Sequence, residues 1–143
     1  MPLTTIALRK GKPAQYRRAL ADGVHAAMVE TIGIPKDDRF QLIDEYEPDS
    51  LIYDPSFLGI ERSDDIVIIR ITLRRGRSRE MRTALHRRIA EKLAATPGVR
   101  PEDVFISLVE NDYADWSPGR GEAPLLRLLE DAGQAVATGQ GSD

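Results

Sequence analysis

Pro2 is the first residue of this sequence whose type and position could do chemistry. A small residue in second place normally allows removal of the initiator Met1, and the chain then begins with a secondary amine. An α-amine in water titrates at about 7.7–8.0, and nearby cations or an apolar pocket lower its pKa because they disfavour the charged form. The neutral amine could act as a general base, whereas the protonated amine could act as a general acid or polarise a carbonyl.

Met-Pro is also a common start without chemical meaning, so the residues around Pro2 decide its interpretation. The residues that follow alternate weakly in the manner of a strand, which would place the amine at the end of a sheet. We therefore expect the Pro2 amine to be the working group of the protein.

A second candidate is the basic segment Arg74-Arg75-Gly76-Arg77-Ser78, between an expected strand and an expected helix. Helix N-termini favour anions, and arginine forks bind carboxylates through paired hydrogen bonds. The segment therefore predicts a site for a small carboxylate, and a solvated basic turn is the alternative. Because adjacent residues on a strand face opposite ways, Arg74 and Arg75 are not both expected to reach one pocket.

Composition excludes several other kinds of site. The 143-residue chain has no cysteine, so disulfides, thiolate metal sites and cysteine nucleophiles are excluded. Its two histidines, His25 and His86, lie too far apart in the sequence for a histidine-rich metal motif. A net charge of −3 gives no general attraction to nucleic acid or to an anionic membrane. No apolar run approaches the roughly 18 residues that span a bilayer, and no signal-peptide pattern is present, so we expect a cytoplasmic protein.

The elements that must position these residues occur twice, because the sequence matches itself at an offset of 65 residues. In the first copy a strand (3–8) precedes a helix that ends at Gly33, and a return strand follows (40–46). In the second copy the strands are 66–73 and 104–109, and a helix lies between them. The matches include Ile6/Ile71, Leu8/Leu73, Arg9/Arg74, Gly11/Gly76, Arg17/Arg82, Gly33/Gly98, Asp38/Asp103, Phe40/Phe105 and Glu45/Glu110. The apolar helix stripes are Tyr16, Leu20, Val24, Met28 and Ile32, then Met81, Leu85, Ile89 and Leu93.

Two such units predict an α/β fold of the α+β kind. Right-handed crossovers make the strands of each unit parallel, so a four-stranded mixed sheet carries two helices on one face. The other face has no helix to cover it, which predicts contact with further subunits. We expect one domain over residues 1–132, with repeat units 2–46 and 66–111. Between the units, 47–62 is an ordered excursion or a hairpin, and 133–143 is a polar, disordered tail.

Several longer segments together resemble one family. They are MPL at the start, VHAAMVETIGIPKDDRFQ, LGIERSD, RRGRS, PEDVFISLVEN and ADWSPGRGEA. In this order they are similar to the tautomerase superfamily, whose enzymes use an amino-terminal proline. Within it, the chain most resembles the malonate semialdehyde decarboxylase branch, over residues 2 to about 125.

The resemblance implies roles for individual residues. Pro2 would be the catalytic proline, and Asp38 would match the decarboxylase's catalytic aspartate, although aspartate is also a common turn residue. The decarboxylase separates its two arginines by one residue, which implies Arg75 and Arg77. The related cis-3-chloroacrylic acid dehalogenase separates them by two residues around a glycine, which implies Arg74 and Arg77.

Three further residues gain a substrate-binding role from the same resemblance. His25 aligns with the dehalogenase's carboxylate-binding histidine and Glu110 with its water-activating glutamate. The alternatives are a partly buried structural histidine and a surface glutamate at a strand end. Trp116 lies in a segment that resembles the family's pocket-flanking D-W-S-x-G motif. Pro118 stands where that motif is expected to carry an aromatic residue, which puts the shape of the pocket in question.

The resemblance implies an enzyme that acts on a small carbonyl or enol carboxylate without a metal or organic cofactor. Pro2 would move a proton between carbon and oxygen, or polarise a 3-oxo group so that a substrate such as malonate semialdehyde loses CO2. The alternatives are a hydratase or dehalogenase of 3-haloacrylate-like acids, and a non-catalytic oligomeric protein that binds a small ligand. The family also implies a homotrimer.

Overall fold

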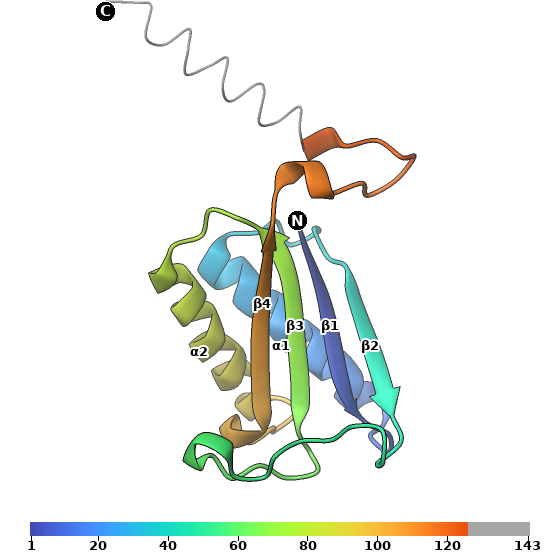
Figure 1. Ribbon diagram of the computed structural model, residues 1–143, viewed down its shortest axis with the longest axis vertical. Coiled ribbons are helices and arrows are strands. Elements are labelled where there is room, and N and C mark those ends of the chain that lie inside the picture. The colour runs from blue at the N-terminus through green and yellow to red at the C-terminus, as the bar shows by residue number, and fades with distance from the viewer. Residues whose placement is uncertain (126–143) are drawn as a thin grey trace, which may run out of the picture.

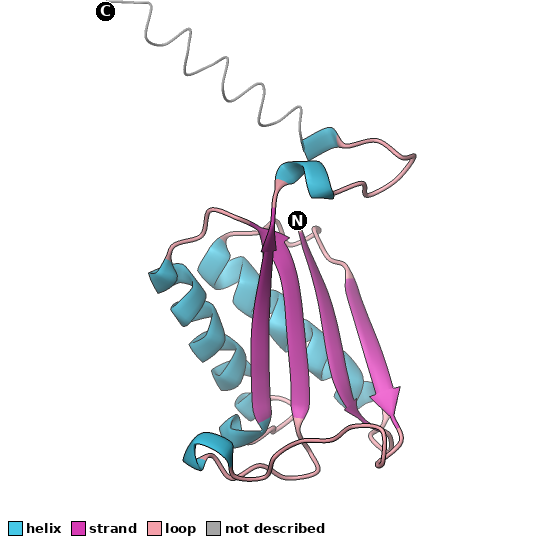
Figure 2. Cartoon of the chain, in the orientation of Figure 1, coloured by secondary structure: helices cyan, strands magenta, loops and turns pink. Residues whose placement is uncertain are grey.

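Two consecutive strand–helix–strand units make up the computed structural model, which describes residues 1–125 (Figure 1, Figure 2). The predicted polar tail at 133–143 lies outside the described residues. No helix in the described part is both long and apolar enough to cross a lipid bilayer. The elements are β1 (Pro2–Arg9), α1 (Ala14–Ile32), β2 (Gln41–Tyr46), β3 (Val67–Arg74), α2 (Arg79–Ala95) and β4 (Val104–Asn111).

The four strands form one mixed sheet in the order β2-β1-β3-β4, which confirms the predicted fold. β1 pairs in parallel with β2, β3 pairs in parallel with β4, and β1 and β3 are antiparallel. Both helices cover the same face of the sheet (Figure 1). Thr5 lies opposite Arg70, and these two residues are also equivalent in the 65-residue repeat. The two units are therefore related by a pseudo-twofold axis that passes between Thr5 and Arg70.

The helix ends follow from local chemistry. Ser78 caps α2, since its Oγ accepts a hydrogen bond from the backbone N–H of Met81 at 3.1 Å. α1 ends at Gly33, which has a φ of 68° that favours glycine. The excursion at 47–62 forms a loop with one short 3-10 turn (Phe57–Gly59) and no hairpin.

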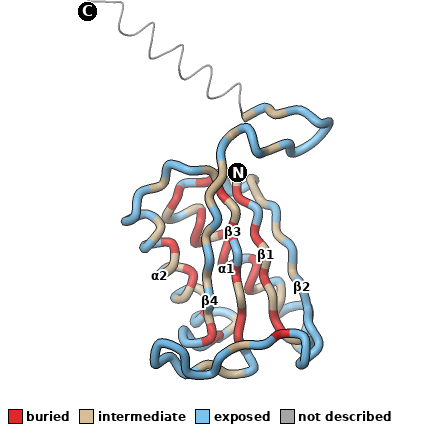
Figure 3. Tube along the Cα trace, viewed as in Figure 1, coloured by how far each residue is buried: buried red, intermediate tan, exposed pale blue. Residues whose placement is uncertain are grey.

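The core lies between the helices and the covered face of the sheet (Figure 3). Alternate residues of β1 and β3 point into it, and the apolar stripes of both helices meet them. Of the predicted stripe residues, Tyr16 is half-buried and Met81 is exposed at the start of α2. The fully buried members include Ile6, Leu20, Val24, Met28, Ile69, Ile71, Leu73, Leu85, Ile89 and Leu93.

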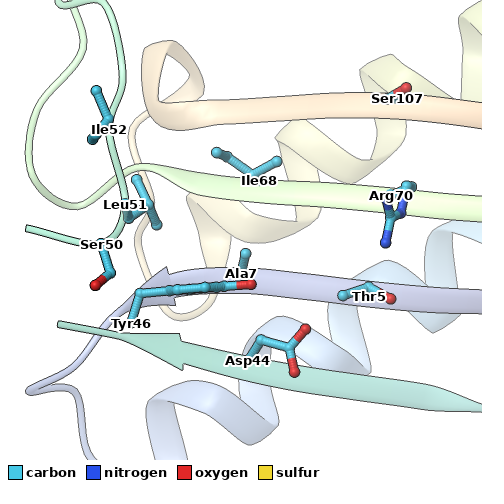
Figure 4. A pocket seen from close by; sticks show the side chains of 10 residues that line it. All are labelled: Thr5, Ala7, Asp44, Tyr46, Ser50, Leu51, Ile52, Ile68, Arg70 and Ser107. Carbon is cyan, nitrogen blue, oxygen red and sulfur yellow. The ribbon is translucent and has the colours of Figure 1, made fainter. Parts of the chain in front are cut away.

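The opposite face of the sheet carries large apolar side chains with no layer over them. Leu42 is 55% exposed and Phe105 is 48% exposed. A hollow of about 370 Å³ lies on this face, and Figure 4 shows Arg70 of β3 and Asp44 of β2 on either side of β1. Within residues 1–125 neither of these two charged side chains forms an ion pair. The uncovered face therefore combines exposed apolar area with two unpaired charges of opposite sign.

Replacing Ser78 with alanine removes the hydrogen-bond acceptor at the start of α2. We expect the free energy of unfolding to fall by about 1 kcal/mol, measured by urea denaturation. Ser78→Asp keeps an acceptor at this position and is expected to unfold at the wild-type midpoint. Equal stability of Ser78→Ala and the wild type would show that the cap does not support the helix.

Candidate active site

A second hollow of about 370 Å³ lies at the end of the sheet where the chain begins. Figure 1 places the N-terminus there, beside the segment that follows β4. Pro2 is the first residue of β1, is buried, and pairs with Leu73 of β3. The hollow thus gathers residues from β1, β3, β4 and the loops next to them. Its lining consists of Met1, Pro2, Leu3, Phe40, Thr72, Asn111, Asp115, Trp116, Ser117 and Pro118.

Asp38 lies against the terminal amine of the chain. Its Oδ2 atom is 3.4 Å from the ammonium nitrogen of Met1, and the aspartate side chain is 17% exposed. Asp38 belongs to the turn between α1 and β2, where its backbone N–H donates to the carbonyl of Pro35 at 3.0 Å. The next part of this loop is tied to β1, because the N–H of Thr4 donates to the carbonyl of Phe40 at 3.1 Å. The loop and β1 therefore hold the carboxylate beside the amine.

Arg77 lies between the end of β3 and the start of α2; it does not line the hollow, but it interacts electrostatically with Asp38. One of its Nη atoms donates to the carbonyl of Arg74 at 3.0 Å. Burial lowers the pKa of Arg77, and the nearby charge of Arg74 acts in the same direction, while Tyr113, Asp38 and Glu110 oppose both. The guanidinium stays charged at any ordinary pH because its unperturbed pKa is so high.

Arg74 and Arg75 point in different directions, in agreement with strand alternation. The guanidinium of Arg74 lies over the ring of Tyr113, 5.1 Å from its centroid. Arg75 is 62% exposed and donates from Nε to Asp112 at 3.2 Å, with Glu110 3.8 Å from one Nη atom. In the described chain Arg74 and Arg77 donate only to backbone carbonyls and meet no carboxylate in an ion pair. These two guanidinium groups are therefore the ones available to an anion.

His25 and Glu110 do not line the hollow. His25 is buried on the inner face of α1, where its Nε2 lies 2.7 Å from the carbonyl oxygen of Lys36. Glu110 points to the helix side of β4 and accepts a hydrogen bond from Arg82 at 2.9 Å. Both residues thus make contacts inside the fold.

The segment after β4 closes one side of the hollow. The indole N–H of Trp116 donates to Oδ1 of Asn111 at 2.8 Å, which fixes the ring against the hollow. The turn before it is capped by reciprocal hydrogen bonds between Asp112 and Asp115. Asn111 lines the hollow and the ring of Tyr113 lies against Arg74, although neither residue was predicted from the sequence. The sequence feature that could have indicated a role for Asn111 is its position, since it is a polar residue just after the last predicted strand.

Comparison with known proteins finds similarity to tautomerases by both sequence and structure. Two family models, both described as tautomerase enzyme, match residues 2–59 and 38–119. YusQ, a probable tautomerase of Bacillus subtilis strain 168, is 41% identical to this chain over 126 residues. That alignment covers 88% of this chain and 99% of YusQ.

Two solved structures share the fold and a third or more of the aligned residues. FG41 malonate semialdehyde decarboxylase, inhibited by 3-bromopropiolate, has a TM-score of 0.83 and 39% identity, covering 87% of this chain and 95% of its own. A malonate semialdehyde decarboxylase described with decarboxylase and hydratase activities has a TM-score of 0.82 and 34% identity, with coverages of 87% and 96%.

The different directions of the arginines predict different effects on anion binding. Malonate, a small dicarboxylate, is a suitable probe for isothermal titration calorimetry. We expect Arg74→Ala and Arg77→Ala each to weaken malonate binding about tenfold or more, because hydrogen bonds to charged groups contribute about 1.5–3 kcal/mol. Arg75→Ala is the matched control and should bind as the wild type does. An equal loss in Arg75→Ala would contradict the assignment.

Proposed function

The chain belongs to the tautomerase superfamily, in its malonate semialdehyde decarboxylase-like branch, and we propose that its working group is the Pro2 amine. Removal of Met1 exposes this amine, which then acts on a small carbonyl carboxylate. The observation that carries the proposal is the placement of the amine end of the chain. Pro2 begins β1 and lines the hollow, and the amine of Met1, the residue before it, lies 3.4 Å from a carboxylate oxygen of Asp38.

Arg77 and Arg74 are the residues proposed to hold the substrate carboxylate. Both are cationic and lack an ion-pair partner in the described part of the chain, so an incoming carboxylate displaces no internal salt bridge. Arginine forks suit this task because they donate two parallel hydrogen bonds. Phe40 and Trp116 line the hollow and supply apolar surface, which excludes water and strengthens the charge interactions.

Asp38 lies beside the Met1 amine, and a pairing of Asp38 with the Pro2 amine after removal of Met1 would favour decarboxylation of a 3-oxo acid such as malonate semialdehyde. A carboxylate beside the amine favours its protonated form. The ammonium of Pro2 would donate a hydrogen bond to the 3-oxo oxygen of the substrate. The bond between the carboxylate carbon and C2 then breaks, CO2 leaves, and its electron pair forms an enolate. C2 finally takes up a proton from water, and acetaldehyde is the product.

Keto–enol tautomerisation is the second candidate, and the two arginines favour it. Cations near the amine disfavour its protonation, so the neutral form becomes more abundant. Neutral Pro2 would remove the enol hydroxyl proton and return a proton to carbon, which converts an enol acid to its keto form. The balance between Asp38 and the arginines thus determines which reaction dominates.

The uncovered sheet face supports assembly into a homotrimer, as the family resemblance implies. Exposed Leu42 and Phe105 would be buried against another copy of the chain. Arg70 and Asp44 lie on the same face with opposite charges, so the face is electrostatically complementary to itself. Such charges fix the register of an interface more than they add to its affinity.

Removal of the secondary amine tests the central proposal. Pro2→Ala should lower kcat/KM about 100-fold or more, since proton transfer by a positioned group contributes about 10²–10⁴-fold. The assays are release of acetaldehyde from malonate semialdehyde and ketonisation of phenylenolpyruvate. Pro48→Ala, in the exposed loop after β2, is the control and should retain full activity. An intact mass that includes Met1, or an active Pro2→Ala variant, would refute the proposal.

A charge reversal on the uncovered face tests the assembly. Arg70→Glu places a second carboxylate on the face that already carries Asp44, so repulsion should weaken the contact. We expect the mass measured by light scattering after size exclusion to fall from three chains toward one. Arg87→Glu, exposed on α2, is the control and should leave the assembly intact. An unchanged mass for Arg70→Glu would place the interface elsewhere.

A further inference from the structure

His25 is a buried histidine that the proposed chemistry leaves without a role. It is 7% exposed and does not line the hollow at the amine end of the sheet. Its Nε2 lies 2.7 Å from the carbonyl oxygen of Lys36. Because a carbonyl oxygen only accepts hydrogen bonds, Nε2 carries the hydrogen and donates it. The ring is therefore attached to the turn that leads from α1 to β2.

That turn carries Asp38, two residues beyond the carbonyl that His25 holds. The turn is closed by the hydrogen bond from the Asp38 N–H to the carbonyl of Pro35 at 3.0 Å. The hydrogen bond from His25 reaches the middle of the same turn from the body of α1. The backbone that sets the position of the Asp38 carboxylate is thus anchored at both its centre and its end.

The second copy shows how an equivalent carboxylate is held without a histidine. Asp103, the repeat partner of Asp38, is 1% exposed, and its oxygens accept from the N–H and the hydroxyl of Ser63, both at 2.7 Å. The residue equivalent to His25 in that copy is Ala90. Asp103 is therefore fixed directly through its own carboxylate oxygens.

Asp38 is held in a different way. Its Oδ2 faces the terminal amine, and within residues 1–125 its Oδ1 is buried without a hydrogen-bond partner. A carboxylate that is to meet an amine and a substrate cannot be tied down through its own oxygens. Its position must then be set through the backbone, and His25 is a side chain with a hydrogen bond to this backbone, at Lys36.

We propose that His25 is a positioning residue that fixes the turn at residues 36–38, so that the Asp38 carboxylate stays against the terminal amine. This inference rests on the proposed function, in which that amine is the one of Pro2 after removal of Met1. It differs from the role that the resemblance implied, since the buried ring holds a backbone carbonyl and makes no contact with the hollow.

The test is a pH titration of the Pro2 amine by 15N NMR in the processed protein, which needs no enzyme activity. Asp38→Asn should lower the pKa of the amine by about one unit, because an opposite charge nearby shifts a pKa by about 1–3 units. His25→Leu should lower it in the same direction by at least half as much. Arg77, which also interacts electrostatically with Asp38, is unchanged in all variants.

A conservative variant separates positioning from loss of packing. The side-chain amide nitrogen of glutamine reaches about as far from the backbone as Nε2 of histidine, so His25→Gln can donate to the same carbonyl. We expect His25→Gln to restore the amine pKa and to bind malonate as the wild type does. The double variant His25→Leu/Asp38→Asn should titrate like Asp38→Asn alone. His86→Leu on α2 is the control and should leave the amine unchanged.

Each result has a defined meaning. A wild-type amine pKa in His25→Leu, together with a shift in Asp38→Asn, would overturn the role of His25 and leave the proposed function standing. No shift in Asp38→Asn would overturn the role of His25 and the preference for decarboxylation, whereas the role of Pro2 itself is decided by the activity of Pro2→Ala. Loss of malonate binding in His25→Gln would show that the histidine binds substrate, and would also overturn the inference. Hydrogen exchange of the Asp38 amide, expected to be faster in His25→Leu, reports on the turn even if that variant is less stable.

Discussion

The antiparallel pairing of β1 with β3 is the constraint on which the rest of the molecule depends. Its register sets Pro2 opposite Leu73, so Pro2 lies beside the end of β3, where the arginine segment begins at Arg74. β4 runs parallel to β3 and ends at the same edge, with Asn111 opposite Arg74. A shift of one residue would turn Pro2 to the other face of the sheet and separate the amine from Asp38.

The two ends of the sheet are similar in backbone but differ in charge. Lys12, the repeat partner of Arg77, forms an ion pair with Asp65 at 2.8 Å. Arg9, the partner of Arg74, forms one with Asp64, also at 2.8 Å. Both acids come from the connection that leads into β3. At the other end of the sheet, Arg74 and Arg77 have no carboxylate partner in the described chain. The same basic turn is thus internally neutralised in one copy and open to an external anion in the other.

The repeat could be predicted from the sequence because buried positions in both copies keep the same residue types in one unbroken register. The separate directions of Arg74 and Arg75 could also be predicted, since strand alternation is a local property. The ion pairs of Arg75 with Asp112 and Glu110 could not, because strand pairing brings those acids near from far along the chain. The hydrogen bond from His25 to the carbonyl of Lys36 could not be predicted either, since every residue has a backbone carbonyl and the sequence does not show which one a histidine will meet.

The pseudo-twofold arrangement also limits how many reactive centres a duplicated chain can have. A tandem fusion of two half-length units produces two equivalent sheet ends, but a polypeptide has only one free amino terminus. Val67 stands where Pro2 stands in the other unit, and its nitrogen belongs to a peptide bond. Fusion therefore halves the number of possible amine-based centres per unit of protein mass. The second sheet end has no free amine and cannot carry out amine-based chemistry, so the residues at that end need only support folding and assembly.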